Sequence, residues 1–213
     1  MIISLSILNV EQQERKNKIN EFVNSSFDNW IHFDVMDGKF VENKTFAYEV
    51  VNEVNNYCSL FKDVHLMTYA PNEYLKEYKR SGTNQITFHY ESVDKKEILN
   101  IINEIKSLDM KVGMSIKPNT NIEEIDEYLK YLDLVLVMSV EPGKGGQKFM
   151  SESLDKIKYL KNKQKDNHYL ISVDGGINNE TSKLVKEAGA DIIVVGTYLT
   201  KEKITNDKIK GLN

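Results

Sequence analysis

The feature that most constrains the fold is a regular alternation between short apolar runs and longer amphipathic segments. The apolar runs are rich in β-branched residues and have the length of single strands. Uninterrupted alternation of this kind predicts βα units arranged around a parallel sheet. The runs expected to form strands are Ile2–Leu8, Trp30–Met36, Asp63–Met67, Gln85–His89, Lys111–Ile116, Asp133–Val140, Tyr169–Val173 and Asp191–Val195.

The segments between these runs carry apolar residues at helical spacing. Lys95–Leu108 has isoleucines at intervals of three and four residues, which predicts an amphipathic helix. Ser151–Leu160 and Thr181–Ala188 follow the same pattern, and Asn119–Lys130 is expected to form a solvated helix. Eight strands thus alternate with seven or eight helices.

The chain length favours a closed barrel over an open sheet. Eight units in 213 residues leave about 27 residues per unit, close to the lower limit for a (β/α)8 TIM barrel. A doubly wound sheet usually has fewer units, and a dinucleotide-binding sheet needs a glycine fingerprint after an early strand, where this chain has Leu8-Asn9-Val10. We therefore predict an α/β chain with one domain over residues 1–213, folded as a closed, eight-stranded parallel barrel.

Composition excludes several classes of protein. The chain has 28 basic and 32 acidic residues, a formal charge of −4 and no long block of like charge, so we expect no nucleic-acid partner. No apolar run approaches the roughly 20 residues that cross a bilayer, and Met1–Val10 lacks the basic start and cleavage site of a signal peptide. The single cysteine, Cys58, fits a reducing compartment. We expect a soluble, cytoplasmic protein with no membrane partner.

The active site of such a barrel lies at the carboxyl ends of its strands. Side chains two positions apart on a strand share a face. One face of Trp30–Met36 is apolar and suits the surrounding helices, which leaves the other face pointing into the barrel. The inward residues predicted in this way on the first, second, third and seventh strands include Ser6, His32, Asp34, Met36, His65, Met67 and Asp174.

Two imidazoles and two carboxylates from three strands form a candidate metal site. A set of histidines and aspartates suits zinc, manganese or ferrous iron, with room left for substrate oxygens. A lone histidine near a strand end is more often structural, and an aspartate there often caps a helix. Because the same inward position recurs on three strands, we favour a site formed by His32, Asp34, His65 and Asp174. A supporting role and a structural role are equally compatible with His89.

Glycine-rich segments follow the sixth, seventh and eighth strands. Glycine lets backbone N–H groups approach an anion closely, and the loops after the last two strands of this barrel are its usual phosphate site. Tight turns between strands and helices also favour glycine, which is the alternative explanation. We favour phosphate binding by Gly143, Gly145, Gly146, Gly175, Gly176, Gly196 and Thr197, with Lys144 either adding a charge or extending into solvent.

Three methionines, Met36, Met67 and Met138, each end a strand. Such residues commonly fill gaps in a core. The alternative is an apolar cap that excludes water from the reacting atoms, and the sequence leaves both interpretations open.

Taken in order, these segments resemble the ribulose-phosphate 3-epimerase family. The most specific match is the run from His32 to Val41, which fits the family pattern His-x-Asp-Val-Met-Asp-Gly-x-Phe-Val. The resemblance extends over essentially the whole chain. Its other matches are Ser6–Leu8, Asp63–Met67, Ile86–His89, Val137–Gly143, Gly145–Gln147, Val173–Ile177 and Ala188–Asp191.

The resemblance implies an activity and a role for each site residue. It implies a metal-dependent epimerase that interconverts D-ribulose 5-phosphate and D-xylulose 5-phosphate by two-base proton transfer at carbon 3. Asp34 and Asp174 are then both acid–base groups and ligands, with His32 and His65, of one divalent ion (Zn, Fe, Mn or Co). Ser6 contacts the phosphorylated ketose, next to which we also place His65 and the three methionines. No organic cofactor is expected, and we expect a homo-oligomer of unspecified size.

Some positions depart from the family pattern. Lys144 stands where the family usually has phenylalanine, in a loop that closes over the substrate. Lys117 stands where asparagine is common, and Glu42 replaces a proline. Thr197 replaces a serine but keeps the hydroxyl group. None of these changes falls on the four proposed ligands.

Three alternatives remain. An epimerase of a six-carbon ketose phosphate, such as allulose 6-phosphate, would share every residue named above. Sugar-phosphate decarboxylases and aldol synthases of similar fold typically carry Asp-x-Lys-x-x-Asp, whereas the segment from Asp63 to Thr68 lacks that lysine and second acid. A phosphosugar-binding barrel without activity is disfavoured because all four ligands are present.

Overall fold

Eight parallel strands form a closed barrel in the computed structural model, which describes residues 1–25 and 29–213. The strands are paired in chain order, and β8 closes the ring by pairing with β1. The predicted TIM barrel is confirmed, and each predicted strand end lies within two residues of the observed one. The strands are β1 (Ile2–Ser6), β2 (Trp30–Met36), β3 (Phe61–Met67), β4 (Gln85–His89), β5 (Lys111–Ile116), β6 (Leu134–Met138), β7 (Leu170–Asp174) and β8 (Ile192–Val195).

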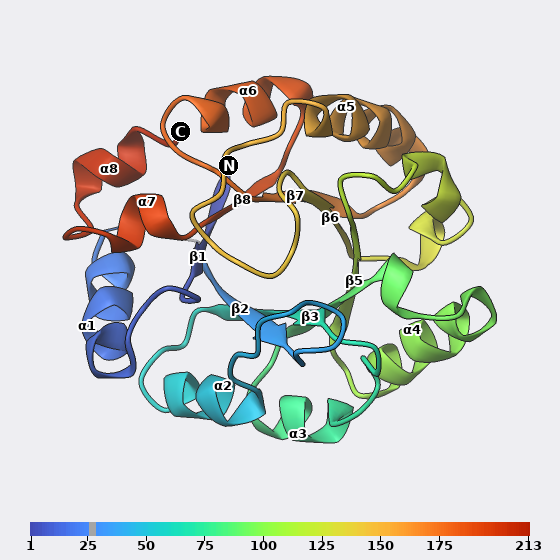
Figure 1. Cartoon of the computed structure of the whole chain (residues 1–213), viewed down its shortest axis with the longest axis horizontal. Coiled ribbons are helices and arrows are strands. Elements are labelled where there is room, and N and C mark those ends of the chain that lie inside the picture. The colour runs from blue at the N-terminus through green and yellow to red at the C-terminus, as the bar shows by residue number, and fades with distance from the viewer. Residues whose placement is uncertain (26–28) are drawn as a thin grey trace.

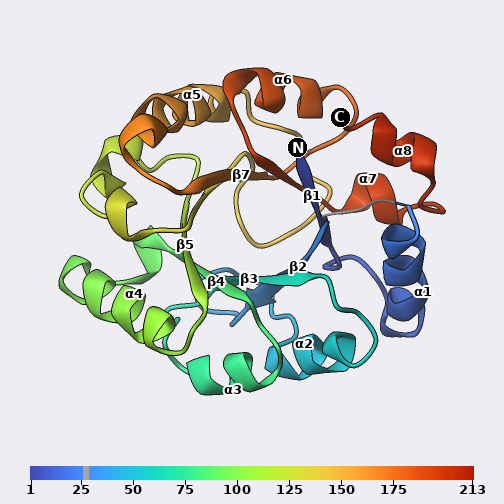
Figure 2. The ribbon, with the colours of Figure 1, turned by 180° about the vertical axis from the view of Figure 1, so that it is seen from behind.

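Helices form an outer ring around the barrel, as two opposite views show (Figure 1 and Figure 2). The α-helices are α1 (Gln12–Val23), α2 (Tyr48–Asn55), α3 (Leu75–Arg80), α4 (Ile98–Ser107), α5 (Ser153–Lys163), α6 (Thr181–Ala188), α7 (Thr197–Thr200) and α8 (Asn206–Lys210). Shorter 3-10 turns are Tyr90–Ser92, Lys95–Glu97, Ile122–Ile125, Leu129–Tyr131 and Gln164–Asp166. None of the helices in the described part of the chain is long and apolar enough to span a membrane.

The core has two parts because successive strand side chains point to opposite faces. Ile31 and Phe33 on β2 are fully buried between the barrel and the helices. Inside the barrel, apolar side chains gather on β6 and β8, where Leu134, Leu136 and Ile192 are buried. The opposite side of the interior, on β2 to β4, is polar yet equally buried, and consists of His32, Asp34, Asp63, His65, Gln85, Thr87 and His89. A buried polar set of this size requires internal hydrogen bonds.

One predicted helix is wrong. The segment Asn119–Lys130, between β5 and β6, contains 3-10 turns in place of an α-helix. Its apolar residues Ile122, Ile125 and Tyr128 are buried and recur every three residues, which matches the three residues per turn of a 3-10 helix. The segment therefore packs against the barrel by its own apolar face and is not simply solvated.

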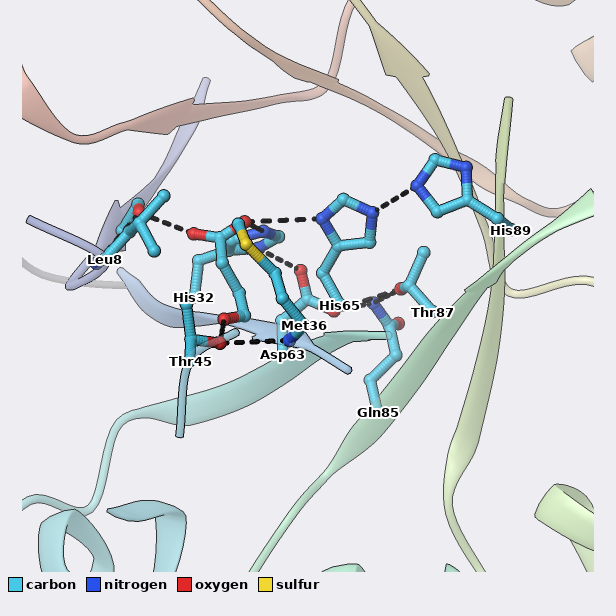
Figure 3. A network of polar contacts seen from close by, with 11 residues as sticks. Leu8, His32, Met36, Thr45, Asp63, His65, Gln85, Thr87 and His89 are labelled. Carbon is cyan, nitrogen blue, oxygen red and sulfur yellow. Dashed lines mark hydrogen bonds and ion pairs between the residues drawn. The ribbon is translucent and has the colours of Figure 1, made fainter. Parts of the chain in front are cut away.

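Two loops shape the barrel mouth. The loop after β6, gold in Figure 1, extends across the carboxyl ends of the strands. The loop after β2 turns back on its own strand, because the Thr45 hydroxyl donates to the Asp34 carbonyl oxygen at 2.7 Å and accepts from the Met36 N–H at 2.9 Å. Figure 3 shows Thr45 beside Met36. This contact fixes the backbone on both sides of Val35, directly after Asp34.

Candidate active site

Four side chains from three strands come together at the mouth. One ligand atom from each of His32, Asp34, His65 and Asp174 can be chosen such that all four lie within 4.8 Å of one another. Asp34 Oδ1 is 3.4 Å from both His32 Nε2 and His65 Nδ1. The four residues predicted as ligands are thus brought together, from β2, β3 and β7.

The two imidazoles turn unpaired nitrogens toward this point. His32 Nδ1 lies 2.9 Å from Asp63 Oδ2, and His65 Nε2 lies 2.9 Å from His89 Nε2. Among the described residues, His32 Nε2 and His65 Nδ1 are buried atoms without a hydrogen-bond partner. A buried polar atom without a partner is costly. Two such nitrogens beside two carboxylates fit the ligand set of a divalent transition metal.

The charges in the site are strongly coupled. Burial by itself lowers the pKa of His32, but the neighbouring carboxylates of Asp34 and Asp63 outweigh burial and raise that pKa well above its usual value. Burial raises the pKa of Asp34, yet the adjacent His32 and His65 more than offset this effect and hold it far below the usual range. The Asp34 carboxylate is therefore ionised. Its Oδ2 also accepts a hydrogen bond of 2.7 Å from the Ser6 hydroxyl.

Asp174 differs from Asp34 in its surroundings. Burial, followed by the negative charge of Asp34, raises the pKa of Asp174 to about 7. Burial has the opposite effect on the imidazole of His65 and lowers its pKa, because the charged form of a histidine is the protonated one. In the metal-free protein two carboxyl groups a few ångströms apart thus have very different proton affinities, the expected result when like charges share a buried site.

A cavity of about 240 Å³ opens beside these side chains. With the exception of His65, which is fully buried behind it, every residue predicted to contact substrate lines the cavity. The lining residues that were predicted are Ser6, Asp34, Met36, Met67, Met138, Gly143, Lys144, Gly145, Gly146, Asp174, Gly175, Gly176, Gly196 and Thr197. The contact of these residues with a substrate stays a prediction.

The turn after β7 requires glycine for reasons of its own. Gly175 and Gly176 have φ values of +123° and +64°, a backbone region that favours glycine. A Cβ atom on Gly176 would lie 2.5 Å from the Phe149 backbone nitrogen, and one on Gly175 would lie 2.5 Å from the Val140 side chain. These glycines therefore allow the loop after β6 to pack against β7. Close packing explains them without an anion, so the phosphate role stays a prediction.

Side chains from two directions hold the loop after β6. Asn43 Nδ2 donates to the Gly143 carbonyl at 2.7 Å, and Gln147 Nε2 donates to the carbonyls of Glu141 and Lys144 at 2.7 and 2.8 Å. The Lys144 side chain is exposed. Gln147 therefore holds the loop together around Lys144, the position where the family pattern has phenylalanine.

The three methionines are buried and also line the cavity. Met36 and Met67 form a small apolar cluster with Phe40 and Val41 at the mouth, whereas Met138 belongs to the apolar half of the barrel interior. They fill space and face the cavity at once, so the two interpretations of their role are compatible.

Sequence reasoning missed several supporting residues. Asp63 was not singled out, although it has the inward position two residues before His65, and it accepts hydrogen bonds from Gln85 and Thr87 as well as facing His32. Asn9 lines the cavity and donates to the Thr197 hydroxyl at 3.0 Å. Its place directly after the first strand was an available signal. The partner of His89, Glu91, lies in a 3-10 turn beyond the strand, where strand alternation gives no guidance.

Comparison with known proteins identifies relatives over most of the chain. The family model described as the ribulose-phosphate 3 epimerase family matches residues 2–200. A ribulose-phosphate 3-epimerase of Chlamydia muridarum is 37% identical over 194 residues, which cover 89% of this chain and 84% of the relative. The enzyme of the same name from Schizosaccharomyces pombe is 39% identical over 186 residues, covering 86% and 80% of the two chains.

Solved structures of low sequence identity share the fold. A tryptophan synthase alpha-subunit from the hyperthermophile Pyrococcus furiosus superposes with a TM-score of 0.69 at 17% sequence identity. The superposition covers all of this chain and 96% of the other. Since this identity is low, the similarity bears on the barrel alone.

Proposed function

The chain belongs to the ribulose-phosphate 3-epimerase family and is an epimerase, and we propose that it interconverts D-ribulose 5-phosphate and D-xylulose 5-phosphate with the help of one divalent metal ion. The observation that carries this proposal is the convergence of His32, Asp34, His65 and Asp174 beside a cavity lined by glycine-rich loops. The family supplies the reaction class, and the site supplies groups suited to it.

Inversion at a carbon atom needs proton transfer on both of its faces. One group removes the proton from the hydroxyl-bearing carbon next to the ketone, and a second group delivers a proton to the opposite face. Asp34 on β2 and Asp174 on β7 both line the cavity, and they belong to strands separated by β1 and β8. We assign them as the acid–base pair. The Ser6 hydroxyl, which donates to Asp34 Oδ2 at 2.7 Å, orients the first of them.

The proposed metal ligands are His32, Asp34, His65 and Asp174, because their donor atoms cluster and both imidazoles present an unpaired nitrogen. These residues would hold a divalent ion, and the bound ion would supply Lewis acidity for the negative charge that develops on the ketone and hydroxyl oxygens of the substrate. The proton transfers themselves belong to the two aspartates. The proposed reaction uses no organic cofactor.

We assign the phosphate group of the substrate to the loops after β6, β7 and β8. Their glycines and Thr197 line one wall of the cavity. Backbone N–H groups in such loops bind the phosphate, and this remote contact positions the sugar for proton transfer. Met36, Met67 and Met138 on the cavity wall exclude water from the reacting carbon.

The test pairs activity with proton exchange. We expect the purified protein to contain a divalent metal, to lose epimerase activity on chelation and to regain it on metal addition. We expect Asp174→Asn to abolish exchange of the carbon-3 proton with solvent, measured by NMR in deuterium oxide, and to lower turnover by at least about 100-fold. Circular dichroism checks that the variant is folded.

Two results would contradict the proposal. Near-normal turnover of Asp174→Asn would exclude the two-aspartate scheme. A rate on a six-carbon ketose phosphate far above the rate on ribulose 5-phosphate, measured side by side, would replace the proposed substrate while leaving the reaction class intact.

A further inference from the structure

A chain of hydrogen bonds leads from His65 away from the cavity. His65 Nε2 lies 2.9 Å from His89 Nε2, and His89 Nδ1 lies 3.1 Å from Glu91 Oε2. Figure 3 shows the His65 and His89 rings facing each other. Both histidines are fully buried, and the Phe40 ring packs against His89 with 4.8 Å between ring centroids. Solvent therefore has no access to the contact between the two rings.

Glu91 is held in place by donors on its other oxygen. Its Oε1 accepts a hydrogen bond of 2.7 Å from the Lys117 backbone N–H and another from the Thr120 hydroxyl. Two donors on Oε1 leave Oε2 facing His89 Nδ1. A carboxylate accepts hydrogen bonds only, so the proton between Glu91 and His89 must reside on His89 Nδ1.

This proton determines the tautomer of both neutral rings. With Nδ1 protonated, His89 presents a lone pair at Nε2, which accepts the Nε2 proton of His65. His65 then carries its lone pair at Nδ1, the buried atom without a partner that lies 3.4 Å from Asp34 Oδ1. In the reverse arrangement His65 Nδ1 is protonated and a lone pair of His89 faces the Glu91 carboxylate. The proton is better placed between His89 and Glu91, because that contact is a hydrogen bond of 3.1 Å, whereas His65 Nδ1 lies 3.4 Å from Asp34 Oδ1 and forms no hydrogen bond with it.

We propose that Glu91 and His89 are positioning residues that fix His65 in the tautomer with a free Nδ1, ready to bind a cation. The role in cation binding rests on the metal site proposed above. The role in setting the tautomer stands on the hydrogen-bond chain alone. Supporting residues of this kind commonly change metal affinity by about 10–100-fold when they are replaced.

The discriminating variant is Glu91→Gln, which preserves size and shape. Lys117 N–H and the Thr120 hydroxyl are both donors, so they retain the oxygen of the introduced amide and turn its NH2 group toward His89 Nδ1. An N–H donor at this position favours the opposite tautomer of both histidines. The substitution therefore reverses the tautomer preference of the two histidines and does not merely remove it. Glu91→Asp, which keeps the negative charge, is the conservative variant.

The experiment measures the tautomer of His65 directly in the metal-free protein. Nitrogen-15 NMR of the imidazole rings, assigned with a His65→Gln spectrum, separates protonated from unprotonated ring nitrogens. We expect protonated Nε2 in the unsubstituted protein and in Glu91→Asp, and protonated Nδ1 in Glu91→Gln. Zn²⁺ affinity, measured by competition with a chelator, should fall by about 10–100-fold in Glu91→Gln.

Glu124→Gln is the matched control, because Glu124 accepts hydrogen bonds from Tyr90 and Lys95 and takes no part in the hydrogen bonds that link His65, His89 and Glu91. It should change neither measurement. Protonated Nδ1 on His65 in the unsubstituted protein overturns the proposal whatever the variants do, as does an unchanged His65 tautomer in folded Glu91→Gln. If the expected tautomers are found but no variant binds Zn²⁺, the proposed metal site fails and the tautomer-setting role stands.

Discussion

At the scale of single residues, His32 and His65 turn different ring nitrogens toward the same point. His32 presents Nε2 because Asp63 occupies its Nδ1, and His65 presents Nδ1 because His89 occupies its Nε2. The partner behind each ring thus selects the nitrogen that faces the site. Strand alternation predicted both histidines, but it could not predict which nitrogen each one presents, because that depends on contacts between strands.

Glu91 also gives the protein a specific sensitivity to acid. Although burial raises the pKa of Glu91, its hydrogen bonds with His89, Thr120 and the Lys117 N–H lower that pKa from 4.5 to about 2. Since the folded-state pKa lies below the unfolded one, this stabilisation is fully present above about pH 4.5 and is lost as pH falls toward about 2. We expect Glu91→Gln to lower the free energy of unfolding by about 1–3 kcal/mol at neutral pH.

Urea unfolding of both proteins, from neutral pH down to about pH 3, checks this prediction. The difference between the proteins should shrink steadily below about pH 4.5. A difference that is constant across the range, or that grows in acid, would mean that the Glu91 carboxylate is not the titrating group.

At the scale of elements, Lys156 of α5 fastens the loop after β5. Its Nζ donates to the carbonyl oxygens of Lys117, Pro118 and Thr120 at 2.9, 2.6 and 2.6 Å. Burial lowers the pKa of Lys156, because a charged ammonium group is less favourable in this partly buried position than in water. The same loop holds Glu91 in place, so one side chain of the outer helix ring supports the residue that contacts His89 from the 3-10 turn after β4.

We expect Lys156→Met to destabilise the protein by about 1–3 kcal/mol, because it leaves three carbonyl groups without their common donor. For a chain of this size this corresponds to a fall in melting temperature of about 2–12 °C. Lys158→Met on the same helix is the control, since the Lys158 side chain is 61% exposed, and its effect should stay within about 0.5 kcal/mol. Equal effects of the two substitutions would contradict the fastening role.

The same loop shows why some elements could be predicted and others could not. Thr181–Ala188 is predicted with its observed bounds, because the apolar spacing of an amphipathic helix is a local pattern. Asn119–Lys130 has its apolar residues three apart, a spacing that 3-10 turns and helices share over one turn, and contacts with the barrel decide between them. Local periodicity therefore predicts strands and long helices better than connecting segments.

At the scale of the whole molecule, the closed barrel brings together residues that are far apart in sequence. Asp34 and Asp174 are 140 positions apart, and they meet only because the sheet closes between β8 and β1. The eight predicted βα units were sufficient to predict closure. The division of the barrel interior into a polar and an apolar half could not be predicted in the same way, because it depends on the pairing of β2 with β3 and of β3 with β4.

A metal ion bound between β2, β3 and β7 would couple local binding to the stability of the entire barrel. A ligand that binds only the folded state at 100 times its dissociation constant adds about 2.7 kcal/mol to the free energy of unfolding, or about 5–10 °C in melting temperature for a chain of this size. We expect Zn²⁺ or Mn²⁺ to raise, and chelation to lower, the melting temperature measured by calorimetry. His65→Gln should lose this response, and His168→Gln, which replaces an exposed histidine, should keep it. A response that persists in His65→Gln but disappears in His168→Gln would place the metal outside the barrel mouth.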